Sequence, residues 1–147
     1  MSRLQDIPVR VEFDLPKQIE PDIVSRVLNE IQVALLDLHA SGQTHSIDLR
    51  QLPRMSPETY QALRGDLSHG EVSAVVDAQL KVEVVETQYP GVWWLRYLNE
   101  REEIKTEIIE ITEMPAILRP HRVEILAGLH KLAARLQAIA HPEGPVH

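Results

Sequence analysis

Apolar and polar residues alternate along several short segments of the chain, and this alternation is typical of half-buried β-strands. The first such segment covers residues 8–14, and a shorter one covers residues 46–50. After Gly70 the alternation is nearly continuous. It predicts four consecutive strands at residues 71–77, 80–88, 92–99 and 103–112. Consecutive strands joined by short polar turns predict an antiparallel meander.

Three other segments carry apolar residues three and four positions apart, which is the pattern of a helix with one buried face. The first covers residues 21–41, and the second begins at Pro57 after a serine N-cap, with Gly70 as its expected end. The third covers residues 125–139. The order β-α-β-α-β-β-β-β-α predicts an α+β fold, with helices packed on a largely antiparallel sheet of about six strands.

No internal repeat, low-complexity tract or Gly/Ser linker divides the sequence. A chain of 147 residues is long enough to bury a core without disulfides. We therefore expect residues 1–147 to form a single domain, with a disordered tail at residues 141–147.

Composition then removes several classes of partner and chemistry. The chain has 15 Lys and Arg against 22 Asp and Glu, a net charge of -7, which disfavours nucleic acid. No apolar run is long enough to span a membrane and no signal-peptide core begins the chain, so we expect a cytoplasmic protein without a membrane partner. The absence of cysteine excludes thiolate nucleophiles and thiolate metal sites.

The remaining residues offer little catalytic chemistry. The seven histidines show no i, i+4 pair, and no nucleophile elbow or phosphate-binding loop is present, so we expect no metal site, no cofactor and no enzymatic activity. Four glutamates of the predicted strands leave one catalytic alternative open, a small hydrolytic enzyme in which Glu86 or Glu107 works with a histidine. The four are Glu83, Glu86, Glu107 and Glu110.

The predicted strand at residues 92–99 contains both tryptophans of the chain, side by side. Neighbouring side chains of a strand point to opposite faces, so Trp93 shares one apolar face with Tyr97 and Trp94 shares the other with Val92. One face must meet the helices. The other is either covered by a second helix layer or exposed as a docking surface, since Trp, Tyr and Arg dominate binding hot spots.

We expect Trp94 to lie in the core and Trp93 to face a partner, so that Trp93→Ala loses the partner while Trp94→Ala mainly destabilises the fold. A third alternative stays open, in which the apolar face serves self-association into a two-fold homodimer. The candidate partner-binding residues are Trp93, Trp94, Arg96, Tyr97, Glu71, Pro90 and Gly91.

A series of short motifs in residues 47–118 is similar to a known family. The motifs are Asp48-Leu49-Arg50-Gln51-Leu52-Pro53, Ser56-Pro57, Gly70-Glu71-Val72-Ser73-Ala74, Glu86-Thr87, Pro90-Gly91-Val92-Trp93-Trp94 and Asn99. Their order and spacing resemble the conserved C-terminal module of the HupH/HyaF hydrogenase expression and formation proteins, in the short single-module form.

The resemblance implies an accessory protein, or chaperone, of [NiFe]-hydrogenase maturation. It implies that the partner is the precursor of the iron–sulfur small subunit or a fellow maturation protein. The family offers no established catalytic residues to transfer. A chain without cysteine cannot hold an iron–sulfur cluster through thiolates, so contact with such a subunit would be between polypeptides.

Overall fold

The computed structural model describes residues 20–142, which form two compact units that divide between Pro115 and Ala116. The strand predicted at residues 8–14 lies outside the described residues, as does most of the predicted tail. The single-domain organisation stays a prediction. Each unit is described by itself.

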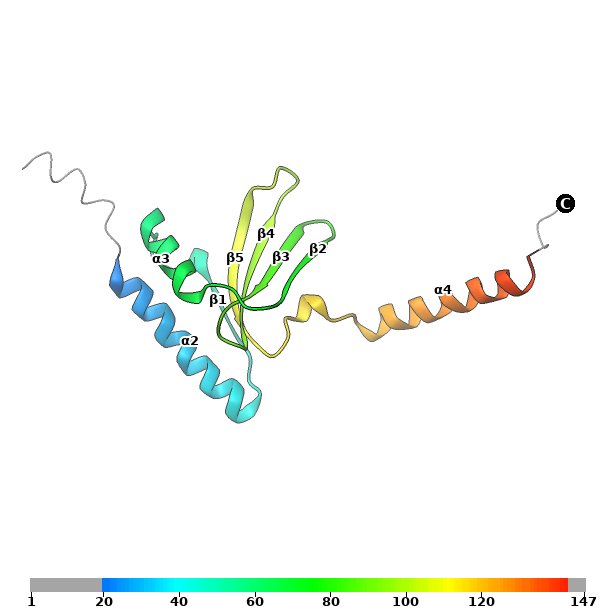
Figure 1. Ribbon diagram of the computed structural model, residues 1–147, viewed down its shortest axis with the longest axis horizontal. Coiled ribbons are helices and arrows are strands. Elements are labelled where there is room, and N and C mark those ends of the chain that lie inside the picture. The colour runs from blue at the N-terminus through cyan, green and yellow to red at the C-terminus, as the bar shows by residue number, and fades with distance from the viewer. Residues whose placement is uncertain (1–19, 143–147) are drawn as a thin grey trace, which may run out of the picture. The chain divides into compact units, whose positions relative to one another are not determined.

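The first unit is built on five antiparallel strands (Figure 1). Their order in the sheet is β1-β5-β4-β3-β2. The last four form the predicted meander, and β1 pairs with the outer edge of β5. The α+β class and the antiparallel sheet are therefore confirmed, with five strands in the described chain where about six were expected. The strands are β1 (His45–Asp48), β2 (Ser73–Asp77), β3 (Lys81–Glu86), β4 (Val92–Leu98) and β5 (Ile104–Ile111).

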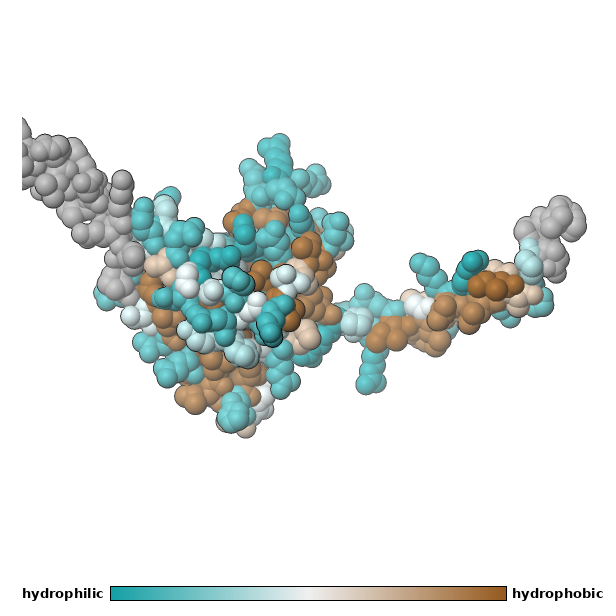
Figure 2. All heavy atoms as spheres, in the orientation of Figure 1, coloured by the Kyte–Doolittle hydropathy of each residue, from teal (hydrophilic) through white to brown (hydrophobic). Residues whose placement is uncertain are grey.

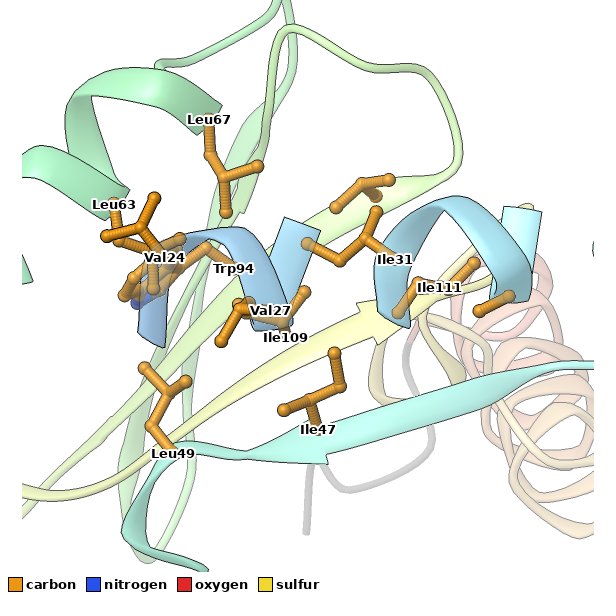
Figure 3. Close-up of a cluster of buried hydrophobic side chains, with 12 residues drawn as sticks. Val24, Val27, Ile31, Ile47, Leu49, Leu63, Leu67, Trp94, Ile109 and Ile111 are labelled. Carbon is orange, nitrogen blue, oxygen red and sulfur yellow. The ribbon is translucent and has the colours of Figure 1, made fainter. Parts of the chain in front are cut away.

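Two helices, α2 (Pro21–Ser41) and α3 (Pro57–Leu67), pack on one face of this sheet, and the short 3-10 helix η2 (Leu49–Gln51) follows β1 (Figure 1). Their apolar faces meet the sheet in a continuous core (Figure 3). Burial of each large apolar side chain stabilises the fold by about 1.5–3 kcal/mol. The core residues are Val24, Val27, Ile31, Ala34, Ile47, Leu49, Leu63, Leu67, Val92, Trp94, Ile109 and Ile111.

Two glycines have backbone roles. Helix α3 ends at Leu67 with Ser68 as its C-cap, so the expected helix end at Gly70 is wrong. Gly70 instead lies against β3, where an added Cβ would stand 2.6 Å from the carbonyl oxygen of Thr87. Gly91 precedes β4 with a φ of 93°, which confirms the positive φ expected there, and packs against α2.

The second unit contains the 3-10 helix η3 (Ala116–Leu118) and the helix α4 (Arg122–Ala140), which extends the predicted helix at both ends. Apolar side chains line α4 and are exposed (Figure 2). No helix in the described part of the chain is long and apolar enough to cross a membrane. The exposed apolar residues of α4 are Val123, Ile125, Leu126, Leu129, Leu132, Leu136 and Ile139.

Candidate functional site

Trp94 lies between the sheet and α3, where its side chain is 2% exposed. The ring of Tyr60 meets it edge to face at 5.8 Å and 88°, and the guanidinium of Arg64 lies 4.5 Å from the indole centroid. Its Nε1 donates a 2.8 Å hydrogen bond to Oε2 of Glu107. Trp94 is therefore a core residue, as expected.

Trp93 lies on the opposite face of the sheet, called here the far face, and is only 4% exposed. Its indole Nε1 donates a 3.1 Å hydrogen bond to the carbonyl oxygen of Thr112, just after β5. Neighbouring far-face residues Val84 and Leu95 are also buried. The expectation that Trp93 projects to solvent is wrong, because its ring is buried and its indole N–H donates a hydrogen bond within the chain. Its role in partner binding stays a prediction.

Arg96 connects three strands on the helix-covered face. Its Nη1 lies 3.3 Å from Oε1 of Glu83 on β3, and its Nε lies 3.9 Å from Oε2 of Glu107 on β5. That Nε is buried and has no hydrogen-bond partner in the structure. Tyr97 is half-buried on the far face, where burial, and then the charge of Glu110, raises the pKa of its hydroxyl. The two residues therefore do not share a surface.

The other candidate residues lie near the end of β3. Glu71 is exposed, and its backbone N–H donates to the Glu86 carboxylate at 3.2 Å. Pro90 is exposed in the turn before β4, and Gly91 packs against Leu35 of α2. The seven candidates do not converge on one site.

The structure shows instead an open, mainly apolar groove of about 610 Å³ beside β5, which we call the edge groove. One wall is the segment from η2 to the start of α3, and the other is the first half of β5. The lining residues are Leu49, Arg50, Leu52, Pro53, Arg54, Met55, Pro57, Tyr60, Gln61, Ile104, Lys105, Thr106 and Glu107.

Glu107 of β5 forms hydrogen bonds to α3 and to β4 at the inner part of this groove. Its Oε2 accepts hydrogen bonds from the Tyr60 hydroxyl at 2.5 Å and from the Trp94 indole at 2.8 Å. Burial, and then the hydrogen bond and charge of Glu107, raises the pKa of Tyr60 to about 12. One oxygen of this carboxylate, Oε2, is thus occupied by donors of the chain itself.

Sequence reasoning did not propose the edge groove as a site. The motifs at residues 48–53 and 56–57 were recognised, but only as part of a family resemblance. The run Leu52-Pro53-Arg54-Met55, with apolar residues in a loop between a strand and a helix, was the available signal. Periodicity does not detect it, because the segment has neither a helical nor a strand period.

A second apolar groove, of about 520 Å³, lies along α2, and we call it the α2 groove. It brings Leu28 and Leu36 of the helix beside Leu67 and Tyr89, the latter just before the Pro90-Gly91 turn. Apolar side chains of this part of α2 are visible at the surface in Figure 2. The α2 groove is therefore an alternative docking surface to the edge groove.

The strand glutamates are divided between the two faces of the sheet. Glu83 and Glu107 flank Arg96 on the helix-covered face, whereas Glu86 and Glu110 flank Trp93 on the far face. Within residues 20–142, neither Glu86 nor Glu107 is hydrogen-bonded to a histidine, and no group of three metal-ligating side chains is present. The hydrolytic alternative therefore gains no support from the geometry.

Two curated proteins to which the chain is similar are both hydrogenase expression/formation proteins. The chain is 29% identical to the hydrogenase expression/formation protein HupQ of Azotobacter chroococcum mcd 1 over 99% of its length and 53% of the relative's. It is 28% identical to the hydrogenase expression/formation protein HoxQ of Azotobacter vinelandii over 73% of its length and 39% of the relative's. The chain thus spans about half the length, or less, of these two curated relatives.

A solved structure shares the fold. The hydrogenase expression protein HupH from Thiobacillus denitrificans ATCC 25259 superposes with a TM-score of 0.73 at 32% identity, over 78% of this chain and 94% of that one. The family model for the HupH hydrogenase expression protein, C-terminal conserved region, matches residues 24–139, which extends beyond residues 47–118 at both ends. The resemblance seen in the motifs is confirmed: the chain belongs to the family of the C-terminal conserved region of HupH hydrogenase expression proteins.

Proposed function

We propose that this chain is a non-catalytic accessory protein of hydrogenase maturation in the cytoplasm. It binds another polypeptide, either the precursor of the iron–sulfur small subunit of hydrogenase or a fellow maturation protein. The names of the relatives support the pathway, because they are hydrogenase expression or formation proteins. The edge groove is the observation that supports binding.

The chemistry of the edge groove suits a polypeptide. Its walls carry Leu52, Met55 and Tyr60, which are partly buried against the core and therefore held in place. Ile104 adds an exposed apolar side chain at the rim. Rigid apolar and aromatic walls favour docking of apolar anchors, and such anchors contribute most of the binding energy of an interface.

The test is binding of the purified small-subunit precursor, and in parallel of the fellow maturation proteins, to the intact chain by titration calorimetry. Ile104→Glu places a charge in the edge groove at a residue that is 44% exposed, so the fold should tolerate it. We expect at least about tenfold weaker binding, since an unpaired charge would be desolvated in the interface.

Val75→Glu is the matched control, because Val75, like Ile104, is a β-branched strand residue with an exposed side chain, and it is 59% exposed. Leu36→Glu serves the same purpose for the α2 groove. Both should bind as the unmodified chain does. Loss of binding in Leu36→Glu alone would move the site to α2, and failure of the unmodified chain to bind any hydrogenase subunit or maturation protein would refute the function.

A further inference from the structure

Among the described residues, the first half of β5 has a strand neighbour on one side only. Strand β1 pairs with β5 from Ile108 to Ile111 and ends at Asp48. There the chain turns into η2, and the Asp48 carboxylate accepts the backbone N–H of Arg50 at 2.9 Å. Ile104, Thr106 and Glu107 therefore pair with β4, with Lys105 at a bulge, and within residues 20–142 no strand lies on their other side.

This free stretch of edge is also one wall of the edge groove. These four residues span about 13 Å of backbone, and outside the bulge at Lys105 their outward N–H and C=O groups can accept another strand. The outer edge of β2 also has no strand partner in the described part of the chain, but the hollow near its end, at Asp77, is lined by polar side chains. An apolar groove next to an open strand edge is the arrangement used for recognition by strand addition.

The rim of the groove is positively charged, although the chain as a whole is acidic. Arg54 and Lys105 line it, are exposed, and form no ion pair in the described structure. Arg50 is paired with Asp48, and Glu107 is held by Tyr60 and Trp94. The unpaired charges at the rim thus favour an acidic partner.

We propose that an extended segment of the partner polypeptide joins the sheet here, pairing with residues 104–107 of β5. Its apolar side chains enter the edge groove and its acidic side chains face Arg54 and Lys105. This inference rests on the proposed function and specifies how the partner is held. A second copy fits less well, because two-fold pairing of this short edge brings the two Lys105 side chains close together.

The probe is a short synthetic peptide, titrated into the intact chain, whose every second residue lies on one face: valines in the middle and a glutamate at each end, with threonines between them. Two further peptides carry N-methyl groups on alternate residues, one on the valines and the other on the threonines. In strand addition only every second N–H faces the protein strand, so one methylated peptide should lose at least about tenfold in affinity while the other retains binding.

Amide hydrogen exchange identifies the edge. We expect the unmethylated peptide to slow exchange within residues 104–107. A peptide with lysine in place of glutamate should bind more weakly, and the double variant Arg54→Glu, Lys105→Glu should reverse this preference by about five- to tenfold at low salt.

Three outcomes would overturn the inference: equal binding of both methylated peptides, slowed exchange at Ser73–Asp77 instead, or slowed exchange at β5 that depends on protein concentration without peptide. The last would indicate self-pairing. If the hydrogenase subunit still binds and Ile104→Glu still weakens it, the proposed function stands while strand addition fails.

Discussion

The two adjacent tryptophans show how residues of the same type take different roles. Trp94 packs among Tyr60, Arg64 and Glu107 under the helices, whereas Trp93 hydrogen-bonds to Thr112 on the far face. Their alternation follows from strand geometry alone. Their burial does not, since it depends on what lies against each face.

Alanine at either tryptophan should destabilise the fold by a similar amount. We expect Trp93→Ala and Trp94→Ala each to lower the free energy of unfolding by about 3–5 kcal/mol, because each removes a fully packed indole. Urea denaturation followed by circular dichroism measures this. A Trp93→Ala variant as stable as the unmodified chain would restore the earlier expectation that this residue serves a partner.

Tyr60 should make stability depend on alkaline pH. Its pKa is raised from 10.0 to about 12 in the folded chain, so the unfolded chain loses the proton first. This contribution is fully present below pH 10 and is lost as the pH rises toward 12. The free energy of unfolding, measured across that range, should fall less in Tyr60→Phe than in the control Tyr89→Phe. Some loss remains, because the pKa of Tyr97 is raised too.

At the scale of elements, the start of α2 is tied to the start of α3 by one polar cluster. The Glu20 carboxylate accepts hydrogen bonds from the backbone N–H of Ser56 at 3.0 Å and from the Thr59 hydroxyl at 3.1 Å. The Thr59 hydroxyl in turn accepts the backbone N–H of Glu20 at 2.8 Å. Hydrogen bonds therefore connect the N-terminal ends of two helices that are distant in sequence.

This cluster gives a prediction in acid. Hydrogen bonds from Ser56, and then from Thr59, hold the pKa of Glu20 below its ordinary 4.5. Its stabilising effect is present above pH 4.5 and is lost as the pH falls through the lowered value. Glu20→Gln should therefore lose less stability in acid than the unmodified chain, as read from urea midpoints. If Glu20→Gln loses as much stability in acid as the unmodified chain does, the prediction is wrong.

The edge groove exists because β1 is short. Four residues pair with the last half of β5, and the chain then turns into η2, which lies beside β5 without pairing with it as a strand. A longer β1 would cover residues 104–107 and remove the open edge. The candidate site thus depends on where one strand stops.

For the whole molecule, charge and apolar surface are unevenly distributed. A chain of net charge -7 carries unpaired cations at the rim of one groove, and its second unit exposes the apolar side of α4. Surfaces with these features are suited to docking of a further polypeptide segment.

Much of the fold could be predicted from local patterns. The period of apolar residues located α2, the four-strand meander and α4, since burial of one face imposes that period on the sequence. The spacing of short motifs identified the family. Which strands became edges, and which residues 36 to 47 positions apart came together around Glu20 and Glu107, are long-range outcomes without a local signature.

The fold class, most of the elements and the family can be read from the amino-acid sequence, because they follow from periodicity, turn residues and motif order within short stretches. The burial of both indoles and the groove beside β5 become visible only when the chain is folded. The reason is physical: exposure of a side chain or of a strand edge depends on what the rest of the chain places against it, and that is fixed by packing between distant segments.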